Sequence, residues 1–179
     1  MADILAQMPL TFCRDPMTFA EGSTSTISTT STNVFILQGR FYSRTALSNQ
    51  ATPTTDYSTG LAFIPIPIPL TTANLPSGVP SAAGYICGFL IGLNANGDLK
   101  VIQGPIVGID AAGVEMAAPS LPPSLGPVGP NAGNNDFCPI GYLVIKAGST
   151  ADATTGWIFG SSNMASVTGV TYTFVDVIG

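Results

Sequence analysis

The sequence predicts an all-β fold, a β-sandwich of jelly-roll or immunoglobulin-like character with an extended N-terminal arm. Three observations predict it. Apolar and polar residues alternate with the period of two that half-buried strands require. Roughly seven to nine such segments are separated by Gly, Pro and Asn turns, and no fixed internal repeat indicates a propeller or a solenoid. The chain has 179 residues, so we expect an arm over residues 1–32 and one sandwich domain over residues 33–179.

The first 32 residues differ in character from the rest. Ala2 to Met8 is the only candidate for a helical turn, and Glu21 to Thr32 is a Ser/Thr tract with little apolar content. Such a composition is typical of an extended arm. We therefore expect this arm to contact neighbouring subunits, with Phe12 and Phe19 as its candidate interface residues.

The segment after the arm has the pattern of a strand. From Val34 the residues alternate, so that one face carries Phe35, Leu37, Gly39 and Phe41 and the other carries Gln38, Arg40 and Tyr42. We expect one half-buried strand here, followed by a polar, turn-rich stretch from Ala46 to Ser58.

The run from Leu61 to Leu70 alternates isoleucine with proline in its second half. A period of two predicts that Ile64, Ile66 and Ile68 share one side. Because proline has no N–H to donate to a ladder, the run is an edge strand or a polyproline-type ribbon. Two interpretations stay open: the isoleucines pack on the chain's own core, or they form a stripe that docks on a neighbouring subunit. All three are candidate interface residues.

The middle of the chain contains a strong hairpin pattern. Tyr85 to Leu93 is apolar on both faces, and Asn94 to Gly97 leads into a second apolar segment from Leu99 to Ile102. Asn and Gly tolerate the positive φ that tight turns demand. A second hairpin is expected between Ile106 to Ile109 and Val114 to Met116, before the proline-rich loop of residues 119–130.

Three apolar segments complete the predicted strands. Cys138 to Lys146 is apolar on both sides, so we expect a central strand. Trp157 to Phe159 follows a Thr-rich turn. The last strand is expected from Val170 to Val177, tied into the sheet close to the end of the chain.

The charged residues exclude several classes of function. The chain has 5 Lys and Arg, 10 Asp and Glu, and no His, and its mean hydropathy is +0.40. A nucleic-acid binder needs a basic footprint, and triad or Cys-His catalysis needs an imidazole. No run approaches the roughly 20 apolar residues of a membrane span. The start of the chain lacks the pattern of a secretory signal, so we expect synthesis in the cytoplasm, with no nucleic acid or membrane as partner.

The remaining reactive residues are expected to be structural. Cys13, Cys87 and Cys138 lack metal-ligand spacing, so we expect small buried hydrophobes. The segment Asn94-x-Asn96-x-Asp98 departs from a calcium loop where Leu99 replaces the required Gly. Carboxylates in turns hydrogen-bond their own backbone, as expected for Asp98, Asp110, Asp136 and Asp152. We therefore expect no catalytic residue, no metal and no cofactor, and we predict that the chain is not an enzyme.

A resemblance adds to this interpretation. The segments Cys138-Pro139-Ile140-Gly141-Tyr142-Leu143-Val144-Ile145, Phe159-Gly160 and Thr171-Tyr172-Thr173-Phe174-Val175-Asp176-Val177 resemble the closing part of small β-rich virion proteins of tailed bacteriophages. The upstream hairpin Asn96-Gly97-Asp98-Leu99, with Gly104 after it, is similar to the same group. The likeness covers the chain from Tyr85 onward.

The resemblance implies a capsid decoration or cement protein. Such a protein binds the outer surface of the capsid, often as a homotrimer, and clamps neighbouring copies of the major capsid protein. A sparsely charged, apolar surface favours assembly independently, because obligate interfaces resemble a domain core cut in half. The alternative is an adhesion module of the tail or fibre that binds a host glycan.

Overall fold

The computed structural model describes residues 12–13, 19–22, 24–37, 39–66, 84–109, 137–148, 156–164 and 167–176. Over these residues the chain forms ten β-strands and no helix. The all-β prediction is therefore confirmed. The candidate helical turn over Ala2 to Met8 lies outside the described residues, as do Ile68 and the loop of residues 119–130.

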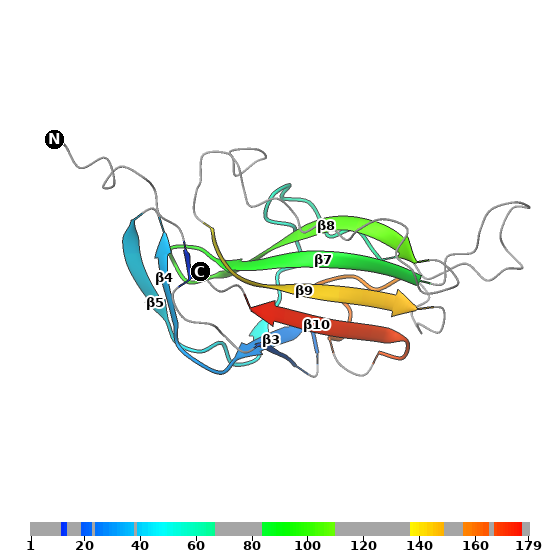
Figure 1. Ribbon diagram of the computed structural model, residues 1–179, viewed down its shortest axis with the longest axis horizontal. Helices are drawn as coiled ribbons and strands as arrows, with labels where there is room; N and C mark the ends of the chain where they lie inside the picture. Colours follow the sequence, from blue (N-terminus) through cyan, green and yellow to red (C-terminus); the bar gives the residue numbers. More distant parts are fainter. Residues whose placement is uncertain are drawn as a thin grey trace, which may run out of the picture.

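The largest element is a four-stranded antiparallel sheet with the order β10-β9-β7-β8. Its strands are β7 (Gly84–Leu93), β8 (Leu99–Ile109), β9 (Cys138–Gly148) and β10 (Val170–Asp176). Figure 1 shows them as long ribbons lying side by side. The segment predicted to be central is central, because β9 lies between β10 and β7.

Two three-stranded antiparallel sheets accompany the large one. The first has the order β1-β4-β5, formed by β1 (Phe12–Cys13), β4 (Asn33–Leu37) and β5 (Arg40–Arg44). The second has the order β2-β3-β6, formed by β2 (Phe19–Glu21), β3 (Thr26–Thr29) and β6 (Gln50–Ala51). β4 contacts β9, and β2 contacts β10. In Figure 1, β4 and β5 stand at one end of the large sheet.

The single strand expected from Val34 to Tyr42 was wrong, because the chain turns in the middle of it. β4 and β5 pair as a hairpin in which Phe35 lies opposite Tyr42 and Leu37 opposite Arg40. Gly39 lies in the turn with a φ of 75°, a conformation that glycine adopts without steric cost. The period of two could not reveal this turn, since the alternation continues through it.

The two short strands expected after the Asn94–Gly97 turn are one long strand, β8. The ladder to β7 shifts register between Gln103, opposite Phe89, and Ile106, opposite Cys87. Pro105 falls in this bulge and is exposed, as expected for proline on an edge strand. The expected partner strand Val114 to Met116 lies outside the described residues.

The main core covers one face of the large sheet. Strand β7 contributes Cys87, Phe89 and Ile91 to this core, and none of them has exposed surface. Residues from the smaller sheets and from two segments without long strands cover them: Phe19, Ile27, Phe35, Leu37, Leu47, Phe63, Ile66, Trp157, Phe159 and Met164. Trp157 forms an isolated β-bridge with Ile66, so the strand expected from Trp157 to Phe159 is reduced to a single pair.

The described part of the predicted arm contributes to this core. β2 and β3 pair with each other, and Ile27 has no exposed surface. The Ser/Thr composition is compatible with burial because the hydroxyls have partners inside the fold. The Thr29 hydroxyl accepts a hydrogen bond from the Leu47 N–H at 2.9 Å, and the Ser25 hydroxyl donates to the Ser162 carbonyl at 2.8 Å. Residues 24–32 are therefore integrated into the fold.

Substituting Ile27→Ala measures this integration. We expect the free energy of unfolding to fall by about 2–5 kcal/mol, because a fully buried isoleucine leaves a cavity. Thr30→Ala, at the exposed bend after β3, is the matched control and should change it by less than about 0.5 kcal/mol. Denaturant titration gives both values. Equal effects of the two substitutions would mean that residues 24–32 are a detachable arm.

Candidate interaction surface

Three large apolar side chains of the described residues are strongly exposed. Phe41 on β5 is 72% exposed, and Leu61 and Ile64 are 70% and 66% exposed. Single exposed apolar residues are ordinary on protein surfaces. Leu61 and Ile64 differ from that case because the backbone that carries them is fixed to the large sheet at several points.

The segment of residues 55–66, here called the strap, lies along the outer edge of β8. The Tyr57 N–H donates to the Val101 carbonyl at 2.8 Å, and the Gln103 N–H donates to the Asp56 carboxylate at 2.7 Å. These bonds satisfy backbone groups that an edge strand otherwise leaves open. The strap therefore protects part of this edge from pairing with another chain.

The buried carboxylate of Asp56 holds the strap's turn. Its Oδ1 accepts bonds from the Ser58 N–H at 2.7 Å, the Ser58 hydroxyl at 2.5 Å and the Thr59 N–H at 3.2 Å. Its Oδ2 accepts the bond from Gln103. A carboxylate with four internal donors serves as a structural anchor, as expected for Asp in turns.

Gln103 fixes the second half of the strap. Its side-chain oxygen accepts a bond from the Ile64 N–H at 2.7 Å, and its side-chain nitrogen donates to the Ile64 carbonyl at 2.8 Å. The amide thus pairs with the Ile64 backbone as a neighbouring strand would. Two residues on, Ile66 exchanges two backbone bonds with Trp157, at 2.8 and 3.0 Å.

The structure separates the predicted interface residues. Ile64 faces outward, whereas Ile66 has no exposed surface and belongs to the core. The expectation that they share a side was wrong, because the segment is not a continuous strand: the Gln103 side chain binds the Ile64 backbone, and Ile66 forms an isolated bridge with Trp157. Ile68 lies outside the described residues, and Phe12 lies in β1, where only its backbone is described.

The remaining predicted interface residue, Phe19, is buried within the chain. Its ring stacks on Phe174 with the centroids 5.7 Å apart. A Cβ added at Gly141 would lie 2.4 Å from the Phe19 ring, so the glycine makes room for the ring on β9. The structure thus places Phe19 and Ile66 in the interior and leaves Ile64 as the exposed member of the predicted set.

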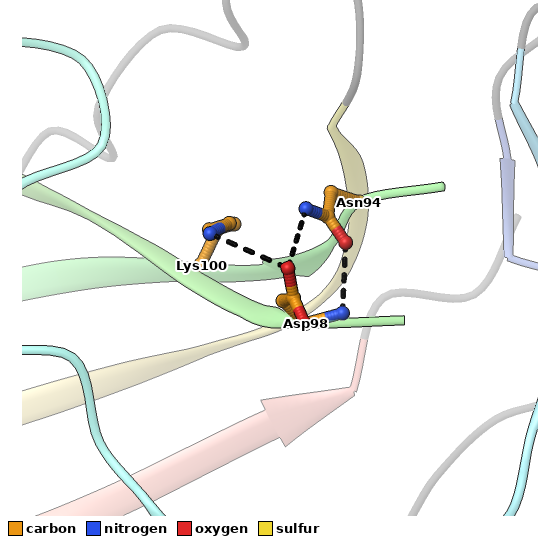
Figure 2. Close-up of polar contacts among 3 residues, drawn as sticks. All are labelled: Asn94, Asp98 and Lys100. Atoms are coloured by element: carbon orange, nitrogen blue, oxygen red, sulfur yellow. Dashed lines mark hydrogen bonds and ion pairs between the residues drawn. The ribbon is translucent and has the colours of Figure 1, made fainter. Parts of the chain in front are cut away.

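The polar cluster at the β7–β8 turn closes the hairpin with side-chain hydrogen bonds (Figure 2). The Asp98 N–H donates to the Asn94 side-chain oxygen at 2.8 Å, and the Asn94 side-chain nitrogen donates to the Asp98 carboxylate at 2.9 Å. Gly97 has a φ of 78°. The predicted hairpin is confirmed. The Lys100 ammonium lies 3.7 Å from the same carboxylate, a surface ion pair of small energetic weight.

The two cysteines whose side chains the structure describes are buried. Cys87 and Cys138 have no exposed surface, as predicted. Burial raises the pKa of the Cys87 thiol to about 11, against a weaker opposing effect of the hydrogen bond that the Gln103 side chain donates to the sulfur. Among the described residues, no three His, Cys, Asp or Glu side chains gather as a metal site, and no helix has the length and apolarity of a membrane span.

Substituting Gln103 tests how the strap is held. Gln103→Ala removes both bonds to Ile64, so we expect hydrogen exchange of the Ile64 amide to accelerate by about tenfold or more and stability to fall by about 1 kcal/mol. Gln103→Glu keeps the acceptor and loses the donor, and it should give a smaller change. Unaltered exchange at Ile64 in Gln103→Ala would show that other contacts hold the strap.

The raised pKa of Cys87 predicts slow alkylation. Only the thiolate reacts, and a thiol of pKa about 11 is roughly one part in a thousand ionised at pH 8. Iodoacetamide at pH 8 should leave the peptide carrying Cys87 unmodified in the folded protein and modify it fully in denaturant, as read by mass spectrometry. Rapid native labelling would contradict the burial.

The described surface therefore combines ordered backbone with exposed apolar side chains, and the buried polar residues Asp56 and Asn94 act as internal anchors. No protein-family model, curated protein or solved structure compared with this chain matches it.

Proposed function

We propose that this chain is a non-enzymatic structural protein of a tailed-phage virion, which binds the outer capsid surface and cements neighbouring copies of the major capsid protein. The observation that carries the proposal is the strap, which presents Leu61 and Ile64 to solvent on a backbone fixed by Asp56 and Gln103. A fixed apolar contact loses little conformational entropy when a partner covers it.

The chain's composition supports an assembly role. Only 8% of its residues are charged, against roughly a quarter in ordinary soluble domains. Burying apolar surface in contacts between proteins contributes about 25 cal/mol per Å². Weak contacts of this kind add up to strong attachment when the copies are linked in an oligomer, because one bound contact raises the effective concentration of the others.

We extend the proposal to the arrangement of the three sheets. We assign the sheets to a β-sandwich framework, in which the large sheet forms one layer and the smaller sheets pack on its buried face. Three copies assemble as a homotrimer on the capsid surface. The resemblance to phage virion proteins supports this assignment, since it spans β9 and β10.

The alternative, a tail or fibre module that binds a host glycan, finds less support. Sugar-binding surfaces present exposed aromatic rings, best of all Trp. The one Trp of the chain, Trp157, is buried and donates its indole N–H to the Asn163 carbonyl at 3.1 Å. Of the described aromatic residues, Phe41 is the strongly exposed one.

Purified virions distinguish the two functions. A cement protein is present in numbers proportional to the major capsid protein, and a fibre module in a few copies at the tail. Quantitative mass spectrometry of intact heads separated from tails gives the ratio. Absence of the chain from heads would contradict the proposal.

Charging the strap should weaken attachment. Leu61→Asp and Ile64→Asp place a carboxylate in the proposed contact, so we expect binding to capsids that lack the chain to fall by about tenfold or more. Thr173→Asp, at an exposed position of β10, is the control of equal charge and should bind normally. Co-sedimentation measures binding, and thermal unfolding confirms the fold. Equal binding by all three variants would contradict the strap's role.

A further inference from the structure

β5 is the outermost strand of its small sheet. Within the described part of the chain its one strand neighbour is β4, and Figure 1 shows it as the outermost labelled strand at one end of the large sheet. The edge of β5 that faces away from β4 therefore carries backbone N–H and C=O groups that an added strand can pair with. β8, by contrast, has part of its edge covered by the strap.

The side chains of β5 are unusual for this chain. Arg40, Phe41 and Ser43 are exposed, and Phe41 is the most exposed large apolar residue of the described chain at 72%. Arg40 and Arg44 are two of the 5 cationic residues of a protein whose net charge is −5. Because side chains alternate along a strand, β5 carries its two arginines on one face and the exposed ring of Phe41 on the other.

The chain's own carboxylates do not neutralise this charge within the described residues. The ion pair found there joins Lys100 to Asp98 and involves neither arginine of β5. The Nε of Arg44 is buried without a hydrogen-bond partner. The side-chain amide of Asn33, which lies opposite Arg44 in the β4–β5 ladder, also has no partner. Both groups are buried inside the fold and are not available to a partner at the outer edge.

Charge argues against a second copy of β5 as the occupant. The register that pairs all five residues of two antiparallel β5 strands sets Arg40 of each copy opposite Arg44 of the other. Like charges directly opposite each other destabilise a strand pair. An acidic strand avoids this repulsion, and its carboxylates are attracted to the arginines of β5.

We propose that the outer edge of β5 binds an extended acidic segment of a partner protein by strand addition. In an antiparallel arrangement, two carboxylates four residues apart lie opposite Arg40 and Arg44, and an apolar side chain between them packs on Phe41. The chemistry of the partner follows from β5 alone. That the partner is a capsid protein rests on the proposed function.

A peptide titration tests the proposal. The probe is a blocked peptide, Thr-Glu-Thr-Val-Val-Glu-Thr, added to the full-length isotope-labelled protein at low salt and followed by backbone NMR. We expect shifts confined to β4 and β5 and weaker binding as salt screens the charges. The same peptide with Lys in place of both Glu should not bind.

Matched variants locate the site. Arg40→Glu should weaken binding by about tenfold or more, and Phe41→Ala should also weaken it. Lys146→Glu makes the same change of charge at an exposed position of β9 and should change affinity by less than about twofold. Thermal unfolding of each variant confirms that the fold is intact.

Four results would overturn the proposal: no shifts on adding the Glu peptide, equal binding of the Lys peptide, equal loss in Lys146→Glu, or dimerisation through β5 that Phe41→Ala abolishes. The proposed function and the proposed β5 site can be contradicted independently of each other. Absence of the chain from virion heads would remove the capsid partner and leave an acidic strand on β5 intact. Presence on heads without peptide binding would remove the β5 site alone.

Discussion

The packing of aromatic rings around Phe89 is the interaction on which the rest of the structure depends. Phe89 lies on the buried face of β7, with ring centroids 4.9 Å from Phe159 and 6.0 Å from both Phe63 and Trp157. Phe63 and Phe159 also meet each other at 5.1 Å. Aromatic pairs at these spacings add about 0.5–1.5 kcal/mol each beyond their buried area. The rings hold segments that have few ladder hydrogen bonds of their own.

This packing determines what the surface presents. Because Phe63 and Ile66 point into the core, the backbone between them runs across the edge of the large sheet, where Gln103 pairs with Ile64. The side chain of Ile64 therefore points into solvent. The same apolar surplus that fills the core thus leaves fixed apolar groups outside it, and the proposed contact with a capsid protein rests on these groups. The small β1-β4-β5 sheet adds an edge strand, β5, with a different, cationic chemistry.

The sequence predicted the parts of the fold that local patterns control. The hairpin of β7 and β8 follows from the Asn and Gly of its turn, and the central place of β9 follows from apolar residues on both faces. The turn at Gly39 and the opposite directions of Ile64 and Ile66 depend on tertiary contacts, which alternation does not encode. Likewise, the Ser/Thr tract looked too polar for a core, and partners far along the chain satisfy its hydroxyls. Of the proposed surfaces, Ile64 was predicted and β5 was not, since its signal is an edge position rather than a motif.

A density map of the intact virion tests the central claim most directly. The account predicts that the chain occupies regular positions on the outside of the head, with the side chains of Leu61 and Ile64 covered by a neighbouring protein. Density for the chain with both side chains facing solvent, or its absence from the head, would contradict it.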